Sequence, residues 1–308
     1  MVSVVLQRPE DTVLAYKKPA LIINAASGST EDIRAEATAL ARDYGLDLRA
    51  EYLEPKDIEG VVEEIIADGC DLFISYGGDG TSRHSGETAV RHGLPFVPLP
   101  GGTMNLLPRL LYGDVDWDHA LVQAFQSGER WHPRGEMNGQ VFFCGGFIGK
   151  ATRVNEVREC LRDRNLGEAL ECLRRVTGEI DLDDTMTFGP SDAPDAARAN
   201  LINIQMPGMS ETAPVGSGIS ITGVDVEGGL DIVSLGVKAL FGGMQSADQT
   251  RNFVVREGVV DYKGAPDVLL DGEPIDMKAP LRFRLFDEGI RVLAPERHDG
   301  MTYKDDPI

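Results

Sequence analysis

The sequence has few basic residues and lacks the long apolar runs of membrane proteins. Its 308 residues include 30 Lys and Arg against 50 Asp and Glu, so the formal net charge is -20. A surface of that sign repels nucleic acid phosphates and anionic lipid headgroups wherever no local basic patch overrides it. No apolar run approaches the ~18 residues of a spanning helix, and the first residues lack the basic-then-apolar order of a signal peptide. We therefore expect a globular protein that does not bind nucleic acid.

Cysteine is also scarce, and its spacing excludes the common cysteine sites. The four cysteines are Cys70, Cys144, Cys160 and Cys172, and they form neither a CxxC pair nor a metal-binding spacing. Such isolated thiols are typical of reduced core residues in a cytoplasmic protein.

Several motifs of nucleotide-binding and hydrolytic enzymes are missing. The chain contains no G-x-G-x-x-G, HExxH or GxSxG, and its five histidines have no ligand spacing. Gly145–Lys150 imitates a P-loop, but it has one residue too few between the glycines, and Ala151 stands where Ser or Thr is needed.

What the first ~130 residues do contain is an alternation of apolar runs with helical patterns. The expected strands are Ala20–Asn24, Leu48–Leu53, Asp71–Tyr76 and Phe96–Leu99. The expected helices are Thr30–Tyr44, Ile58–Ala67, Thr81–His92 and Trp117–Phe125, the first with a capping signal at Ser29 and Asp32. This order predicts a parallel sheet with ligands at the carboxyl ends of its strands.

After residue 128 the pattern changes to short runs separated by Gly, Pro or Asp, which predicts antiparallel strands. The runs are Val141–Phe143, Leu201–Met206, Ile219–Thr222, Leu230–Leu235, Phe253–Arg256, Val259–Tyr262, Val268–Leu270, Leu281–Phe286 and Ile290–Leu293. A helix over about 151–177 and an exposed loop over Gly189–Arg198 interrupt them. We expect two domains, an α/β domain over 1–128 and a mainly antiparallel β domain over 129–308, with a C-terminal tail that could return to the first.

The sharpest motif is Gly77-Gly78-Asp79-Gly80-Thr81, directly after the third strand and before a helix. Three glycines in four residues allow close backbone approach to a ligand, and a helix N-terminus directs N–H groups at an anion. A tight turn is the alternative reading. Asp79 favours the ligand, because a carboxylate beside a phosphate requires a divalent cation between them.

Two further loops follow the same logic. Gly101-Gly102-Thr103-Met104-Asn105 follows the fourth strand, and Asn24-Ala25-Ala26-Ser27-Gly28 follows the first. Each alone is ordinary turn chemistry, with Asn105 as a helix cap in the loop after the fourth strand. Because these loops and the Asp79 loop would meet at one edge of a parallel sheet, each supports the others.

One motif stands out in the second half. Asp271-Gly272-Glu273 follows a β run, and Asp-Gly is by itself the usual signal of a hairpin turn.

Taken in order, these motifs resemble the diacylglycerol kinase catalytic family, which includes bacterial diacylglycerol kinases and sphingosine kinases. The resemblance covers about residues 19–295. Residues 77–81 match the family's GGDGT loop, residues 102–105 and 24–28 resemble its other two loops, and Asp271–Glu273 matches its Asp-Gly-Glu motif. GGDGT is shared with NAD kinases, and the acidic motif about 190 residues later favours the lipid kinases. Residues 135–149 and Glu227–Asp231 resemble further family stretches.

Three positions depart from the family pattern. Ala25 replaces a proline, Leu106 replaces an aspartate after Asn105, and Glu227-Gly228 replaces an Asp-rich start. The second change removes one polar contact to nucleotide or metal, and the third argues against a structural metal there.

The resemblance implies an ATP-dependent lipid kinase of two domains, with Mg²⁺ and a diacylglycerol-like acceptor hydroxyl in the inter-domain cleft. Catalytic roles fall to Asp271, Asp79 and Glu273, and metal contacts to Asp79 and Glu273. The residues implied in nucleotide binding are Asn24, Ser27, Gly28, Gly77, Gly78, Gly80, Thr81, Gly102, Thr103 and Asn105. Asp271 is the candidate proton acceptor, but Asp79 and Asp271 could exchange roles.

The expected partner is a lipid-like small molecule from phospholipid metabolism. Residues 150–177 carry seven basic against five acidic side chains, which would support weak, transient contact with the inner membrane surface; a solvated helix face is the alternative. Unpaired strand edges could support a homodimer. The rival functions are an NAD kinase-like or other small-molecule kinase, and a catalytically silent nucleotide-binding module.

Overall fold

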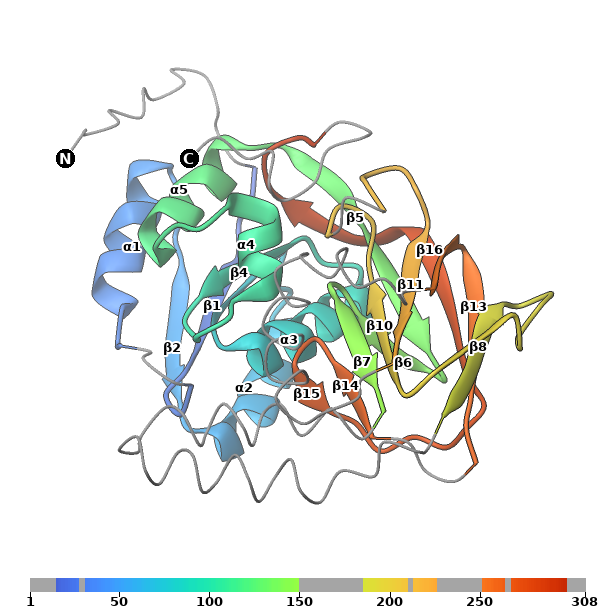
Figure 1. Cartoon of the computed structure of the whole chain (residues 1–308). Coiled ribbons are helices and arrows are strands. Elements are labelled where there is room, and N and C mark those ends of the chain that lie inside the picture. The colour runs from blue at the N-terminus through green and yellow to red at the C-terminus, as the bar shows by residue number, and fades with distance from the viewer. Residues whose placement is uncertain are drawn as a thin grey trace, which may run out of the picture. The chain divides into compact units, whose positions relative to one another are not determined.

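Two structural units divide the chain. The computed structural model describes residues 15–27, 31–149, 185–209, 213–225, 251–263 and 267–297 (Figure 1). Within these ranges, unit 1 holds the residues up to His132 together with Asp287–Arg297, and unit 2 holds Pro133–Phe286.

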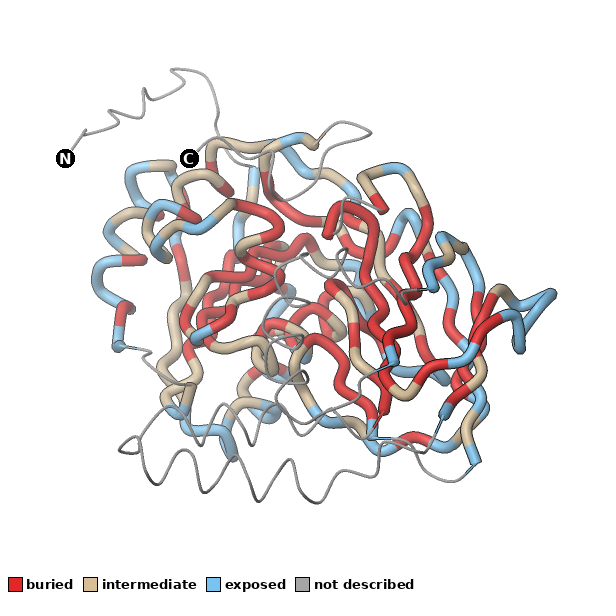
Figure 2. Tube along the Cα trace, viewed as in Figure 1, coloured by how far each residue is buried: buried red, intermediate tan, exposed pale blue. Residues whose placement is uncertain are grey.

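Unit 1 is built on a parallel sheet in the order β2-β1-β3-β4. Its strands are β1 (Pro19–Asn24), β2 (Arg49–Leu53), β3 (Leu72–Gly77) and β4 (Phe96–Pro100). The central strands β1 and β3 are almost wholly buried (Figure 2), which explains their unbroken apolar sequences. The four strands occur where the sequence predicts them, and their parallel pairing is as expected.

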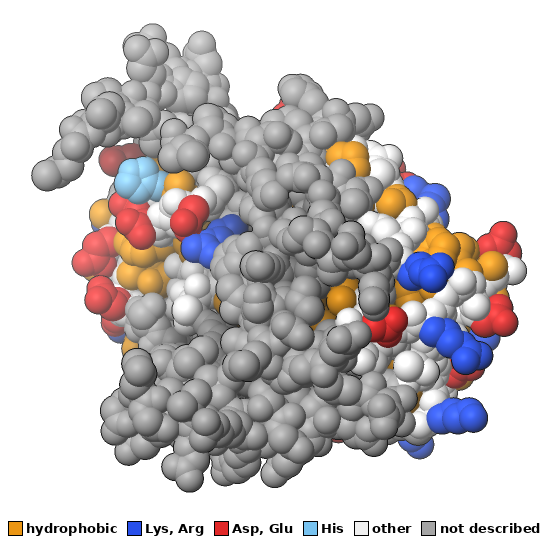
Figure 3. Space-filling view, in the orientation of Figure 1, with side chains coloured by type: hydrophobic (Ala, Val, Ile, Leu, Met, Phe, Trp, Pro, Cys, Tyr) orange, Lys and Arg blue, Asp and Glu red, His pale blue; other side chains and the backbone are white. Residues whose placement is uncertain are grey.

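Five helices connect and cover this sheet: α1 (Arg34–Asp43), α2 (Pro55–Ala67), α3 (Asp79–His92), α4 (Leu106–Tyr112) and α5 (Trp117–Gln126). α1 and α5 lie next to each other (Figure 1), where the rings of Tyr44 and Phe125 pack with their centroids 5.4 Å apart. Acidic side chains gather over α1 at the left of Figure 3, as the net charge leads one to expect.

Two helix predictions need correction. α1 begins at Arg34 rather than at Thr30, and its N-cap residue is Ile33, without a side-chain cap. The carboxylate of Asp32 instead accepts a hydrogen bond from the backbone N–H of Arg34, so it supplies the first turn with an acceptor from outside the helix. α4 is foreseen only in the alternative reading of Asn105 as a helix cap, without bounds: six of its seven residues are buried, so the sequence shows no helical period, and Pro108 falls in the first turn, where proline is tolerated.

A long C-terminal strand, β16 (Leu281–Leu293), runs through both units. In unit 1 its second part pairs in parallel with β4 at Val292 and Phe96. The sequence predicts two runs here, but they form one strand, because Asp287–Gly289 continue the extended backbone without a turn.

Unit 2 consists of antiparallel strands. The bounds are β5 (Glu129–Met137, beginning in unit 1), β6 (Gln140–Phe142), β7 (Gly145–Ile148), β8 (Met186–Pro190), β9 (Ala197–Ala199), β10 (Leu201–Gln205), β11 (Ile219–Val224), β12 (Arg251–Val255), β13 (Glu257–Asp261), β14 (Val268–Leu270) and β15 (Glu273–Pro274). One sheet has the order β12-β11-β10-β7-β14-β15, and in the other the first part of β16 is followed by β13, β8 and β9. The predicted fold class, a parallel α/β part plus a mainly antiparallel β part, is therefore confirmed.

Most short runs predicted in the second half are strands. The expected loop over Gly189–Arg198 is shorter than predicted, because Gly189 and Pro190 end β8 and Ala197 begins β9. The expected strand 230–235, the helix over 151–177, and Cys160 and Cys172 lie outside the described residues. None of the described helices combines the length and the hydropathy needed to cross a bilayer.

Candidate functional site

Three polar loops meet in unit 1 at the carboxyl ends of β1, β3 and β4, and Thr81 joins the first of them to the start of α3. The amide Nδ2 of Asn24 donates to the hydroxyl Oγ1 of Thr81 over 2.9 Å. The hydroxyl of Ser27 lies 3.1 Å from the same oxygen. Residues 24–27 and 77–81, which the sequence predicts to act together, are thus in direct contact, while Gly28 lies outside the described residues.

The first glycine loop is shorter than predicted, because α3 begins at Asp79 rather than at Thr81. Gly77 ends β3, Gly78 is the N-cap residue, and the N–H of Ser82 already donates to the carbonyl of Gly78 over 3.0 Å. Gly80 and Thr81 therefore belong to the first helical turn. By helix geometry, the N–H groups of this turn have no acceptor within the helix, which is the arrangement that binds anions.

The second glycine loop lies directly against the first. The N–H of Gly101 donates to the carbonyl of Gly77 over 2.9 Å. A Cβ atom added to Gly102 would stand 2.7 Å from the Cα of Gly78. Only a glycine at position 102 lets the two backbones approach this closely.

Asp79 fastens the second loop to the start of α3. Its carboxylate accepts one hydrogen bond from the backbone N–H of Leu106 over 2.6 Å and a second from the N–H of Asn105 over 3.2 Å. Leu106, which replaces an aspartate of the family pattern, contributes its backbone here and buries its side chain in the core. The sequence motif indicates only metal binding and catalysis for Asp79. It does not indicate this contact, which positions the second loop.

Asn105 shapes the second loop from within. It has a left-handed backbone with φ of 50°, and it precedes α4 without capping it through its side chain. Its side chain instead accepts from the N–H of Gly102 over 2.7 Å and donates to the carbonyl of Gly102 over 3.0 Å. Met104 is buried, whereas Thr103 is exposed.

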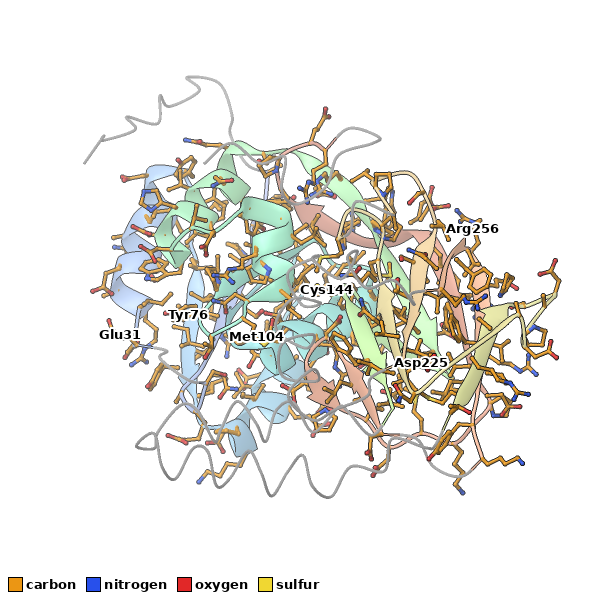
Figure 4. The ribbon with its side chains drawn as sticks, viewed as in Figure 1. Glu31, Tyr76, Met104, Cys144, Asp225 and Arg256 are labelled. Carbon is orange, nitrogen blue, oxygen red and sulfur yellow. The ribbon has the colours of Figure 1, made fainter. Side chains whose placement is uncertain are left out.

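Tyr76 precedes the first glycine loop at the end of β3; it and Met104 of the second loop are marked in Figure 4. Burial raises the pKa of the Tyr76 phenol, and its ring packs against Trp117 with the centroids 6.3 Å apart. The phenol therefore stays neutral and does not add negative charge beside the loops.

Asp271, the acidic candidate of unit 2, is a buried residue whose carboxylate accepts three backbone hydrogen bonds. The donors are the N–H groups of Phe143 at 2.7 Å, Cys144 at 2.8 Å and Gly145 at 3.0 Å; Cys144 is labelled in Figure 4. These bonds hold the carboxylate in one orientation. Its N–H in turn donates to the carbonyl of Gly145 over 2.8 Å.

The hairpin interpretation of Asp271–Glu273 is correct. Leu270 and Glu273 pair across a two-residue turn in which Asp271 and Gly272 have φ of 48° and 85°. Such a turn favours Asp-Gly because both central residues need positive φ. Glu273 is partly exposed at the start of β15.

Gly145–Ile148 forms strand β7, so the P-loop likeness of this stretch is one of sequence alone. A Cβ atom on Gly145 would stand 2.2 Å from the carbonyl oxygen of Ile204, and one on Gly146 would stand 2.5 Å from that of Leu269. The glycines therefore serve close packing between strands.

The unit 1 loops suit a nucleotide phosphate. They offer the N–H groups of the first turn of α3, the hydroxyls of Ser27 and Thr81, and a backbone surface without side chains at Gly78 and Gly102. In the described ranges, no three His, Cys, Asp or Glu side chains gather to form a metal cage. Mg²⁺ usually takes one or two protein carboxylates beside substrate phosphates, so Asp79 fits as a single ligand.

A cavity with a volume of ≈ 270 Å³ lies elsewhere in unit 1, at the amino end of β1. Two of the cations that line it are engaged: Lys18 bonds the carbonyl of Asp68, and Arg49 pairs with three acidic side chains. This cavity is on the opposite sheet edge from the three loops, so we do not assign it to nucleotide binding.

Comparison with known proteins supports the family resemblance. Residues 18–131 match the family model described as the diacylglycerol kinase catalytic domain. A probable lipid kinase YegS-like protein of Pseudomonas aeruginosa is 32% identical over 143 residues, which are 44% of this chain and 46% of the relative. One of the same name from Xanthomonas campestris is 39% identical over 95 residues, or 28% and 29% of the two chains. The chain thus matches less than half the length of these curated relatives.

Solved structures resemble the chain over most of its length. A putative diacylglycerol kinase from Bacillus anthracis superposes with a TM-score of 0.68 at 18% identity, covering 92% of this chain and 98% of that one. A second diacylglycerol kinase structure from that organism gives 0.66 at 15% identity. This likeness establishes the fold, and together with the sequence matches it confirms the resemblance to the diacylglycerol kinase catalytic family that the motifs predict.

Proposed function

We propose that the chain is a lipid kinase, which transfers the terminal phosphoryl group of ATP to a hydroxyl of a diacylglycerol-like acceptor. The observation that carries the nucleotide half of this proposal is that three loops meet at the start of α3, the first through Thr81 and the third through Gly77 and Gly78. The acceptor half rests on the family resemblance. Mg²⁺, when bound with the nucleotide, neutralises phosphate charge and so eases attack on the phosphorus.

In this proposal the residues of unit 1 hold the nucleotide. The N–H groups of the first turn of α3 and the hydroxyls of Ser27 and Thr81 bind phosphate oxygens. Asp79 has a double role in this proposal, since its carboxylate keeps the second loop in place through Asn105 and Leu106 and would also bind the metal that accompanies the nucleotide. Positioning of this kind is what phosphoryl transfer chiefly needs.

Asp271 remains our candidate for accepting the proton of the acceptor hydroxyl, with Glu273 as a metal ligand or orienting group. The three backbone N–H groups that bind Asp271 hold its carboxylate fixed, but they also occupy lone pairs that a base would use to accept a proton. Glu273 is therefore the alternative base. The variants Asp271→Asn and Glu273→Gln separate the two, because only loss of the true base lowers kcat without a matching loss of nucleotide affinity.

The test is a transfer assay with the full chain, γ-labelled ATP and a panel of acceptors. We expect label in diacylglycerol presented in mixed micelles, and no label in NAD or glycerol, when Mg²⁺ is present; chelation of Mg²⁺ should abolish transfer. Label in NAD without label in any lipid would replace this proposal by an NAD kinase-like activity.

A specific observation also favours a silent nucleotide-binding module. Both candidate carboxylates, Asp79 and Asp271, already accept backbone hydrogen bonds, which is a purely structural use. ATP binding without transfer to any acceptor of the panel would support the silent module. Transfer that is lost in folded Asp79→Asn and Asp271→Asn proteins would exclude it.

A further inference from the structure

Arg83 carries two buried donor nitrogens for which the described residues supply no acceptor. Arg83 lies in α3, and its Nε and Nη1 atoms are buried. Neither nitrogen has a hydrogen-bond acceptor, and in the described part of the chain no carboxylate pairs with this guanidinium. The sequence gives no signal for Arg83, because an arginine inside a helix has no distinguishing pattern.

This arrangement is unfavourable in the protein alone. A guanidinium stays charged at every ordinary pH, and each buried donor that lacks an acceptor loses its hydrogen bonds to water without replacement. A bound anion would supply the missing acceptors. Arg130 also has a buried nitrogen without an acceptor, but its guanidinium is partly satisfied. Its Nε donates to the carbonyl of Pro295.

Helix geometry relates Arg83 to the first turn of α3. Arg83 follows Asp79 by four residues, so the two lie on one face of α3 about 6 Å apart along its axis. Side chains of a helix lean toward its N-terminus, which here is where the Gly77–Thr81 and Gly102–Asn105 loops meet. The Asp79 carboxylate is held by Asn105 and Leu106, and no ion pair joins it to Arg83.

We infer that Arg83 binds a phosphoryl group held at the start of α3, and that it is a specificity-determining residue for the charged end of the ligand. The inference rests on the proposed function for the identity of that ligand. The phosphoryl group can belong to the terminal phosphates of the nucleotide or to the phosphate monoester of a phosphorylated lipid. Both present oxygens that accept hydrogen bonds from a guanidinium.

The first test measures binding by the full-length protein, without turnover. ATP, adenosine and phosphatidic acid in neutral micelles are titrated into wild type, Arg83→Gln, Arg83→Lys and Arg91→Gln. Arg91 is the matched control, since it lies on the same helix, is exposed and pairs with Glu87 at 3.3 Å. We expect Arg83→Gln to weaken binding of ATP or phosphatidic acid about 10- to 100-fold, Arg83→Lys to weaken it less, and Arg91→Gln and adenosine binding to be unchanged.

The two ligands distinguish the source of the phosphoryl group. A loss confined to ATP assigns Arg83 to the nucleotide, and a loss confined to phosphatidic acid assigns it to the lipid product. Equal affinities of wild type and Arg83→Gln for both ligands would overturn the inference, and so would a wild-type protein that binds neither.

The second test separates ligand binding from a structural role. Because the guanidinium lacks partners in the free protein, Arg83→Met should leave the unfolding midpoint unchanged or raise it, while it weakens anion binding. A structural arginine would do the reverse, so a lower midpoint with unchanged affinity contradicts the inference. A wild-type chain that transfers phosphate while Arg83→Gln binds ATP and phosphatidic acid normally would refute the role of Arg83 and leave the proposed function intact. A wild type that transfers no phosphate but whose anion binding still depends on Arg83 would refute the proposed function and support the role of Arg83.

Discussion

The carboxylate of Asp79 accepts a hydrogen bond of 2.6 Å from the backbone N–H of Leu106. This contact joins the first residue of α3 to the first residue of α4, so the loops that follow β3 and β4 are held as one surface. A residue that the motif suggests for metal binding therefore also positions the backbone of its neighbouring loop. Substitutions of Asp79 should affect stability and binding together.

We expect Asp79→Asn to lower the free energy of unfolding by about 1–3 kcal/mol, because one acceptor oxygen is replaced by an NH₂ group facing a backbone N–H. Denaturant titration measures this loss. Asp57→Asn is the matched control: Asp57 is exposed in the first turn of α2, and its change should cost less than about 1 kcal/mol. Equal losses in the two variants would show that the Asp79 contacts contribute nothing specific.

Gly102→Ala should separate the two glycine loops. The added methyl group would stand 2.7 Å from the Cα of Gly78, a backbone atom that cannot turn away. Overpacking of this kind costs about 1–3 kcal/mol, and we expect ATP affinity to fall with it. Gly128→Ala is the control, since a Cβ atom there meets nothing within 4 Å; its stability and ATP affinity should match wild type. Unchanged ATP binding in Gly102→Ala would argue against the loops as the nucleotide site.

The parallel sheet and the three loops could be predicted from the sequence because their signals are local. A buried strand such as β3 shows as an apolar run, and a glycine cluster after it marks the turn. α4 left no such signal, because a helix buried on nearly all sides has no amphipathic period. The hydrogen bonds from Asn105 and Leu106 to Asp79 join residues 26 and 27 positions apart through backbone atoms, so no residue type announces them.

The same limit applies to Asp271 and Arg83. The hairpin at Asp271 could be predicted from Asp-Gly, but the three N–H donors come from a segment more than 120 residues earlier. The lack of partners at Arg83 depends on everything packed around α3 and has no pattern in the chain. Local geometry is thus encoded in short motifs, whereas the electrostatic partners of charged groups emerge only from tertiary structure.

Asp271 allows two substitutions with different consequences. Asn tolerates the left-handed backbone at φ of 48°, but it replaces one of the two carboxylate oxygens that accept three N–H bonds. Asp271→Asn should therefore lower the free energy of unfolding by about 1–3 kcal/mol. Ala loses every acceptor and is also strained at this φ, which adds about 1–2 kcal/mol. Denaturant titration should rank wild type, Asp271→Asn and Asp271→Ala in that order.

Asp276→Asn serves as the control for this series, because Asp276 is exposed in the segment that follows β15. Its unfolding free energy should stay within about 0.5 kcal/mol of wild type. If Asp271→Ala were no less stable than Asp271→Asn, the turn would not be under the backbone constraint that its φ indicates.

Cys70 should react slowly with alkylating reagents although it borders the cavity at the amino end of β1. Burial raises the pKa of its thiol from 9.0 to about 11, and only the thiolate is nucleophilic. Two pH units correspond to about 100-fold less thiolate at pH 8 in the folded protein than in the unfolded chain. Peptide-level mass spectrometry after timed alkylation measures the rate at Cys70 alone.

The contribution of Cys70 to stability depends on pH in a definite direction. The fold favours the neutral thiol, so the contribution of Cys70 to stability is complete below pH 9, the unfolded value, and is lost as the pH rises through about 11. The alkylation rate of the folded protein should therefore keep rising up to pH 11, whereas in urea it should level off near pH 9. Equal rates at pH 8 with and without urea would mean that the Cys70 thiol is not desolvated by the core around Leu72, whose carbonyl accepts its S–H.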